Sequence, residues 1–91
     1  MAKDWKKELV KLLFSARSKK EVKELLNSLL TPSEYDELAK RWQIVKMLIG
    51  DTAQRKIKKE LGVSIATVTR GSKELNYGNG VFQRFFKRLR S

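Results

Sequence analysis

The part of the sequence that most constrains the fold runs from Thr52 to Leu75 and reads TAQRKIKKELGVSIATVTRGSKEL. Its pattern predicts two short helices joined by a tight turn. We expect the first helix over Ala53–Leu61, with Thr52 or Asp51 as its cap, and the second from Ile65 onward. Two short helices joined in this way form a helix-turn-helix.

The turn between these helices is specified at both ends. Gly62 follows the first helix, where the chain needs a residue that accepts a positive φ. Ser64 has the side chain of an N-cap for the second helix. Val63 and Val68 occupy the N′ and N4 positions of a hydrophobic staple. We therefore expect the apolar side chains around the turn to pack between the two helices.

The second helix of this pair presents small and short polar side chains to the outside. Such side chains approach base edges closely, and the methyl groups of Ala and Thr contact the methyl group of thymine. The positions concerned are Ile65, Ala66, Thr67 and Thr69. Basic residues occupy the rest of the outer surface, namely Arg55, Lys56, Lys58, Lys59, Arg70 and Lys73. A DNA-reading unit and a helical hairpin with a solvated basic face both fit this pattern.

Charge and composition narrow the possible functions. The 91 residues contain 21 Lys and Arg against 10 Asp and Glu, and the resulting net charge of +11 favours a polyanionic partner. A cationic surface selected for solubility is the alternative. The absence of cysteine and histidine excludes a disulfide framework, a zinc site built on these residues and a histidine base. No paired carboxylates, nucleophile–base set or phosphate-binding glycine loop stands out, so we expect neither an enzyme nor a metal site.

Nothing in the sequence indicates a membrane protein or an exported one. No apolar run approaches the roughly 20 residues of a membrane-spanning helix. The first residues, MAKDWKKELV, carry charge throughout and lack the apolar core of a signal peptide. We therefore expect a cytoplasmic protein without a membrane partner.

Two helices are expected before residue 30. Asp4 is placed to cap the first helix, which should end near Ala16. The apolar stripe of this helix is broad for a helix with one neighbour, which suggests burial against several elements, including a second chain. The run Ser18–Glu21 fits a capping box that starts the second helix.

The run LTPSEY, from Leu30 to Tyr35, gives the clearest helix start in the sequence. Thr31 should cap the helix, Pro32 takes the first helical position, and Glu34 closes the capping box. We expect this third helix to end at Ile49.

A turn cluster over Asn76–Gly80 separates the helix-turn-helix from a last short helix over Val81–Arg90. That helix is apolar on one side and basic on the other, and the basic side could contact phosphates or stay in solvent. Six helices and no useful strand candidate predict an all-α fold. We expect one domain over residues 1–91, with dimerisation helices over 1–50, the reader over 52–75 and the C-terminal helix over 80–91.

Two segments resemble the Trp repressor (tryptophan operon repressor) family. They are LLTPSEYDELAKRWQIV and QRKIKKELGVSIATVTRGS, within a region from Leu29 to Leu75 that makes up about half of the chain. The motifs LTP.E and IAT.TRGS, with Arg41, carry the likeness. The resemblance implies a six-helix fold in an interlocked homodimer, with two reader units held about one DNA turn apart. It also implies L-tryptophan as corepressor.

The same resemblance implies a ligand site. Arg41 and Arg70 would sandwich the indole ring, and Arg70 with the Thr31 hydroxyl would hold the carboxylate. Gly71 would leave room beside the ring. Leu30 would line the pocket or present its carbonyl to the ammonium group.

Simpler roles are open to three of these residues. Thr31 has a sufficient function as a helix cap. Arg41 lies four residues after Glu37 and could form an exposed ion pair with it. Arg70 could be a plain phosphate contact.

Two departures from the family pattern bear on this site. Glu74 stands where the family commonly has serine, and a carboxylate there would hold the ammonium of an amino acid more tightly or indicate a different ligand. The segment from Arg41 to Gly50 is one residue shorter than the family pattern, and one residue turns a helix by about 100°. The reader would then lie at a different angle to the core, or the helix end would be reshaped.

For DNA, the resemblance implies contacts from both reader helices, many of them through water. Arg55 would reach guanine directly, and the N-terminal N–H groups of the second reader helix suit a phosphate. The implied contact residues are Gln54, Arg55, Lys58, Ile65, Ala66, Thr67, Thr69, Arg70 and Lys73.

Together these observations predict a dimeric, sequence-specific repressor that binds an operator in double-stranded DNA and responds to L-tryptophan. One alternative is the same dimer with no ligand or with another amino-acid-like ligand. Another is a sequence-nonspecific nucleic-acid binder that depends on its charge. A third is a membrane-active cationic helix protein, suggested by the Phe and Arg residues of the C-terminal stretch.

Overall fold

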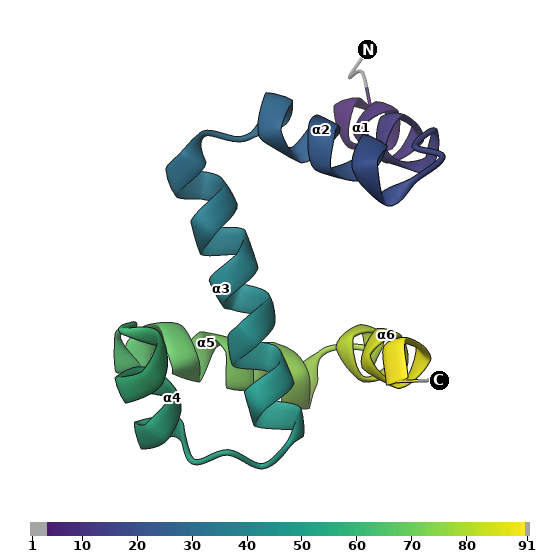
Figure 1. The fold of residues 1–91 in the computed structure, drawn as a ribbon. Helices are drawn as coiled ribbons and strands as arrows, with labels where there is room; N and C mark the ends of the chain where they lie inside the picture. The colour runs from purple at the N-terminus through teal and green to yellow at the C-terminus, as the bar shows by residue number, and fades with distance from the viewer. Residues whose placement is uncertain (1–3, 91) are drawn as a thin grey trace. The chain divides into compact units, whose positions relative to one another are not determined.

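The computed structural model describes residues 4–90, and within this range the chain forms six helices and no strand (Figure 1). The all-α prediction is thereby confirmed. The chain divides between Asp36 and Glu37 into two compact units, so that α3 begins in the first and continues into the second. The helices are α1 (Trp5–Phe14), α2 (Lys19–Leu29), α3 (Pro32–Ile49), α4 (Gln54–Leu61), α5 (Ile65–Tyr77) and α6 (Val81–Arg90).

The first unit contains α1, α2 and the first turn of α3. Asp4 caps α1 as predicted, because its side chain accepts a hydrogen bond of 2.9 Å from the Lys7 N–H. The helix ends at Phe14, two residues before the predicted end. None of the described residues of this unit is buried, and Trp5 and Phe14 are 74% and 83% exposed. The apolar stripe of α1 is therefore not covered by the other described residues of the first unit.

The two predicted capping boxes differ in detail. At α3 the box is reciprocal, since Thr31 Oγ1 accepts from the Glu34 N–H at 3.1 Å and Glu34 Oε1 accepts from the Thr31 N–H at 2.9 Å. At α2, Ser18 Oγ accepts from the Glu21 N–H, but the Glu21 carboxylate accepts from Arg17 rather than from Ser18. The second box is thus shifted by one residue on one side.

The second unit is built around a small apolar core contributed by three helices. Ile44 of α3, Ile57 of α4 and Val68 of α5 are almost completely buried and form one cluster. Around it pack the partly buried side chains of Met47, Leu48, Leu61 and Val63. The core therefore fixes α4 and α5 against the C-terminal half of α3.

The connection between α3 and α4 departs from the prediction. Asp51 adopts a left-handed conformation, with φ of 61°, and α3 ends in a Schellman motif. In this motif the N–H groups of Asp51 and Thr52 donate to the carbonyls of Leu48 and Met47. Ala53 is the N-cap of α4 and makes no side-chain cap hydrogen bond, so the prediction of Thr52 or Asp51 as the cap was wrong. Asp51 and Thr52 therefore belong to the end of α3, and Ala53 is the residue that directly precedes α4.

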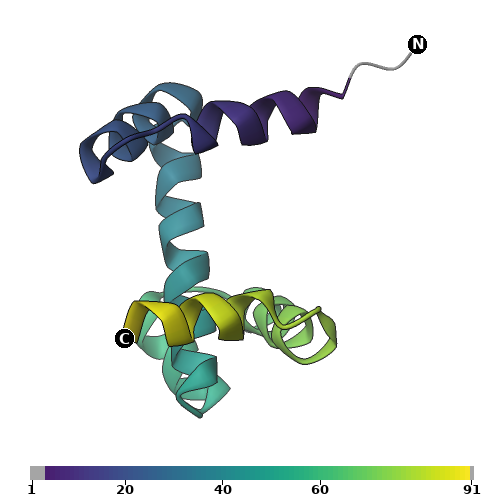
Figure 2. The same ribbon diagram turned by 90° about the vertical axis from the view of Figure 1, so that its right-hand side faces the viewer.

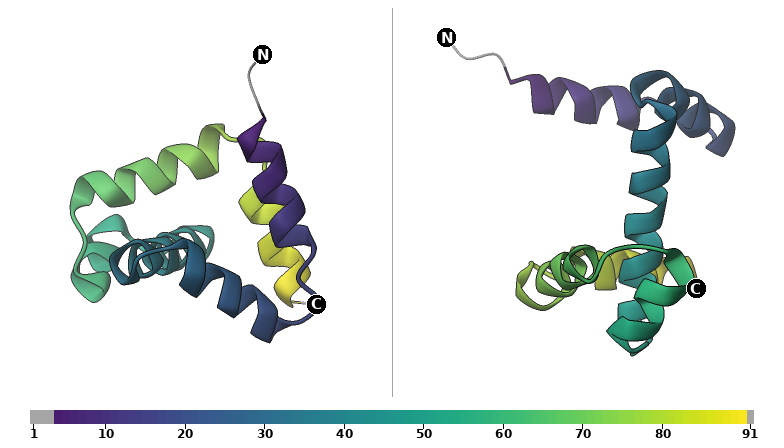
Figure 3. Two further views of the ribbon diagram at one scale, coloured as in Figure 1. Left: turned by 90° about the horizontal axis from the view of Figure 1, so that it is seen from above. Right: turned by 90° about the vertical axis from the view of Figure 1, so that its left-hand side faces the viewer.

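The end of α5 also differs from the prediction, because the helix continues to Tyr77 and the turn is shorter than expected. The chain turns over residues 78–80 and enters α6, which runs in a different direction from α5 (Figure 3, left). Figure 2 shows α6 lying across α3. Trp42 of α3 is in contact with this helix. The Trp42 ring lies 6.3 Å from the ring of Phe82 and 6.5 Å from the ring of Phe86, between centroids.

Candidate functional site

The helix-turn-helix formed by α4 and α5 has the local geometry that the sequence predicts. Gly62 ends α4 in the left-handed region, with φ of 64°, where a side chain would be strained. Ser64 caps α5 by accepting a hydrogen bond of 3.2 Å from the Thr67 N–H. Val68 has no exposed surface and Val63 packs against the same cluster. The turn is therefore fixed by one glycine, one cap and an apolar contact.

Every residue predicted to contact DNA has an exposed side chain. Gln54, Arg55 and Lys58 lie on α4. The others lie along α5, at Ile65, Ala66, Thr67, Thr69, Arg70 and Lys73. No part of α5 apart from Val68 is fully buried among the described residues, so the helix is accessible to a partner.

Two threonines on α5 have part of their hydrogen-bonding capacity in use. Thr69 Oγ1 donates to the carbonyl of Ile65 at 2.9 Å, so that its methyl group and the hydroxyl lone pairs remain for a partner. Thr67 Oγ1 lies 2.8 Å from Ser64 Oγ and belongs to the cap of the helix. We therefore expect a substitution of Thr67 to disturb the start of α5 more than a substitution of Thr69.

The basic residues of α4 lie on two different faces. Arg55, Lys58 and Lys59 line an open depression together with Gly62 and Val63 of the turn. Lys56 is placed differently, because its Nζ lies 3.8 Å from the carboxylate of Glu60. The positive charge beside the turn is thus separate from the ion pair on the helix.

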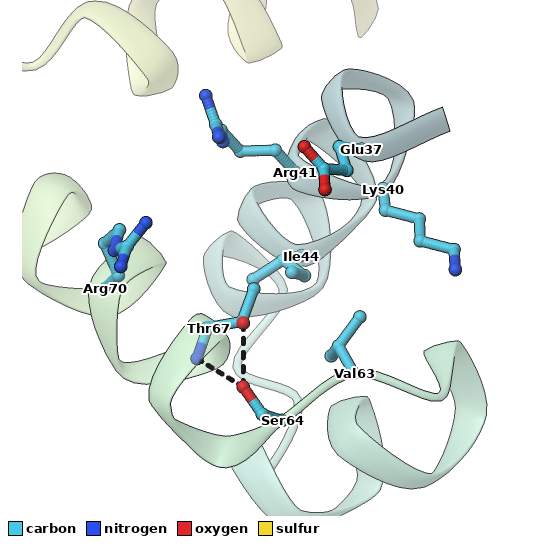
Figure 4. Close-up of a pocket in the computed structure, with 8 residues that line it drawn as sticks. All are labelled: Glu37, Lys40, Arg41, Ile44, Val63, Ser64, Thr67 and Arg70. Carbon is cyan, nitrogen blue, oxygen red and sulfur yellow. Dashed lines mark hydrogen bonds between the residues drawn. The ribbon is translucent and has the colours of Figure 1, made fainter. Parts of the chain in front are cut away.

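A cavity of about 290 Å³ lies between α3 and the start of α5 (Figure 4). Arg41 of α3 and Arg70 of α5 reach into the space between the two helices, above the side chain of Ile44. The remaining lining residues are Glu37, Lys40, Val63, Ser64 and Thr67. Within residues 4–90, Glu37 and Arg41 do not form an ion pair, so the guanidinium of Arg41 is not held by that carboxylate.

A second cavity, of about 390 Å³, adjoins the first and shares Arg41 and Arg70 with it. Its further lining residues are Ile44, Thr67, Gly71, Glu74 and Phe82. Four residues predicted as ligand contacts, Arg41, Arg70, Gly71 and Glu74, are therefore brought together in one place. Phe82, which also lines this cavity, was not among the predicted ligand contacts. Its position in the apolar stripe of α6 predicts only burial.

Gly71 has a packing role in addition to its place at the cavity. A Cβ at this position would lie 3.0 Å from the Cγ2 of Ile44 and 3.6 Å from the Cδ1 of Leu48. The glycine thus allows α5 to approach α3 closely.

The two other predicted ligand residues, Leu30 and Thr31, belong to the first unit and line neither of these cavities. Thr31 uses its hydroxyl oxygen as a cap acceptor, and its hydroxyl hydrogen remains as a donor. Leu30 is half-buried and lines a small hollow with Pro32 and Tyr35. The helix-cap role proposed for Thr31 is therefore confirmed.

The described residues include neither a metal-binding cluster nor a membrane-spanning helix. They contain no group of three or more acidic side chains close enough to hold a metal ion. None of the described helices is both long enough and apolar enough to cross a membrane.

Comparisons with known proteins agree with this architecture. A family model described as "Trp repressor protein" matches residues 3–90. The chain is 43% identical over 74 residues to a Trp operon repressor homolog of Vibrio campbellii, covering 80% of this chain and 73% of that protein. It is 44% identical over 73 residues to a Trp operon repressor homolog of Vibrio vulnificus, covering 79% and 71%. The crystal structure of a TrpR like protein from Eubacterium eligens matches with a TM-score of 0.86 and 30% identity, covering 91% of this chain and 86% of that one.

Proposed function

This chain belongs to the Trp repressor protein family, and from that premise we propose that it is a homodimeric, sequence-specific DNA-binding repressor with L-tryptophan as corepressor. The observation that carries the proposal is the position of the second cavity. It is lined by Arg41 of α3 and by Arg70, Gly71 and Glu74 of α5. A ligand bound there touches the same helix that presents its outer residues to DNA.

The cavity offers complementary groups for a zwitterionic amino acid with an aromatic side chain. The guanidinium planes of Arg41 and Arg70 can stack on the faces of an indole ring. Arg70 can also donate to the ligand carboxylate, because a guanidinium has five N–H donors. Glu74 supplies a carboxylate for the ammonium group. Leu30 and Thr31 remain predicted ligand contacts that rest on the family resemblance alone.

We propose that α5 is inserted into the major groove and that α4 contacts the backbone beside it. The side chains on the outer surface of α5 are short at Ala66, Thr67 and Thr69, which permits a close approach to base edges. The basic depression beside the turn, with Arg55 and Lys58, is suited to phosphates. The net charge of +11 supports both contacts.

A homodimer is supported by the surface of the first unit. The large apolar side chains of α1 are exposed, and they form a stripe too broad for a solvent-facing helix: Trp5, Leu9, Val10, Leu12, Leu13 and Phe14. Exposed contiguous apolar surface of this kind marks an interaction site. A second copy would cover it and would bring a second reader to the same DNA.

The two binding events are coupled in this proposal because they share side chains. Arg70 and Thr67 line the cavities and also lie on the reading helix. A ligand that bridges α3 and α5 favours one orientation of α5 over others. By linkage, the DNA that selects this orientation must raise the affinity for the ligand by the same factor.

The proposal is tested by measuring ligand binding and DNA binding on the same preparation. Calorimetric titration of the purified protein with L-tryptophan should give saturable binding at one site per chain. An operator obtained by in vitro selection should then bind more tightly when L-tryptophan is present, with scrambled DNA as control. A protein that binds selected and scrambled DNA equally would refute sequence-specific repression, and selected DNA bound equally with and without L-tryptophan would refute the corepressor.

A further inference from the structure

The C-terminal helix α6 lines part of the second cavity. None of the ligand contacts implied by the family resemblance lies on this helix. Phe82 of α6 is half-buried and lines the second cavity. Across the cavity lie Arg41 of α3 and Arg70 and Glu74 of α5. The polar groups thus come from α3 and α5, whereas α6 adds an aromatic ring.

Contacts of α6 with α3 and with α5 hold this ring in position. Phe82 packs against Trp42, with ring centroids 6.3 Å apart and ring planes inclined by 34°. Phe86, one turn further along α6, meets the same indole edge-on at 6.5 Å. Gln83 Nε2 donates to the carbonyl of Leu75 at 2.9 Å and ties α6 to the end of α5. Phe82 is therefore a fixed part of the site.

We propose that Phe82 contacts the aromatic ring of the bound ligand and that it determines specificity for aromatic over aliphatic amino acids. The inference rests on the proposed function, since it assigns a residue to the same ligand site. Aromatic pairs attract each other beyond the effect of area burial when their centroids lie about 4.5–7 Å apart. The cavity of about 390 Å³ lies within the range of small-molecule sites. An aliphatic side chain in the same space gains neither the ring contact nor the guanidinium stacking.

The test compares two leucine substitutions that loosen the same contact with Trp42. Phe82→Leu removes a ring that lines the cavity, whereas Phe86→Leu removes a ring that packs on Trp42 without lining either cavity. In calorimetric titrations we expect Phe82→Leu to raise the Kd for L-tryptophan about 3- to 10-fold. We expect Phe86→Leu to change it less than about 2-fold. Thermal melting by circular dichroism reports whether each variant is folded.

Two binding results would overturn the inference, and they are distinguishable from each other. If both variants weaken L-tryptophan binding equally, Phe82 acts by docking α6, and the proposed function is unaffected. If the unaltered protein does not bind L-tryptophan, the proposed corepressor is wrong and the inference is lost with it. If Phe82→Leu does not fold, the contact can be measured in the unaltered protein by nuclear magnetic resonance. Phe82 ring protons should show nuclear Overhauser effects to the indole protons of bound L-tryptophan, and their absence would contradict the contact.

Discussion

The phosphate contact proposed for Lys58 can be tested through the salt dependence of DNA binding. Lys58 is exposed and lines the depression beside the turn, where the backbone of a duplex would pass if α5 occupies the major groove. Replacing Lys58 by Gln removes the charge and keeps a side chain of similar length. A dimer carries the substitution twice, so the complex loses two phosphate contacts.

The size of the effect follows from counterion release. Each neutralised phosphate contributes about 0.9 to the negative slope of log K against log salt for double-stranded DNA, so two contacts contribute about 1.8. Between about 50 and 200 mM salt, the affinity of Lys58→Gln should therefore fall about 10-fold less than that of the unaltered protein. Base preference should not change, because phosphates carry no sequence information.

Lys56→Gln is the matched control, because it makes the same charge change on the same helix. The Lys56 ammonium lies 3.8 Å from the Glu60 carboxylate and does not line the depression. Fluorescence anisotropy with a labelled operator at five or six salt concentrations gives both slopes. Equal slopes for the two variants would mean that only net charge matters, and the proposed path of the backbone along α4 would be refuted.

Three further substitutions test the other parts of the site. Arg70→Ala should weaken binding of both L-tryptophan and operator DNA, and calorimetry showing unchanged ligand affinity would contradict the proposed sandwich. Thr69→Ala should alter base preference in a selection experiment with little change in melting temperature, whereas equal weakening on every sequence would make Thr69 a backbone contact. Ile57→Ala should lower the free energy of unfolding by about 2–5 kcal/mol, because this side chain is completely buried in the core of the second unit. Urea denaturation of that variant and of the unaltered protein, at equal protein concentration, measures the difference.

The sequence predicts best those features that depend on neighbouring residues. The αL glycine at position 62, the Ser64 cap and the reciprocal box between Thr31 and Glu34 are all present in the structure. Each involves groups no more than three residues apart, so the local pattern contains all the partners. The six helices were predictable for the same reason.

Two kinds of feature could not be predicted from neighbouring residues. In the first, two helices compete for the same residues, and in the second, the contact joins residues far apart in the sequence. Asp51 and Thr52 both have capping side chains, but their backbone groups close the end of α3, and α4 starts from Ala53 without a side-chain cap. Phe82 shows the second kind of difficulty. The spacing of the phenylalanines predicts an apolar face for α6, but only the docking on Trp42 places one of them beside Arg41 and Arg70.

The geometry of α5 is compatible with the proposed ligand site and the proposed DNA-reading surface on one helix of 13 residues. Gly71 allows α5 to lie close to α3, while Thr69 is exposed and keeps its methyl group and hydroxyl lone pairs available to a partner. Arg70 lies between these two positions, and its five donors allow it to stack on a ring and still reach an anion. Any change that moves α5 against α3 therefore alters the cavity and the reading surface together. The coupling typical of allosteric proteins requires a ligand to bind one orientation of α5 about 5- to 150-fold more tightly than another.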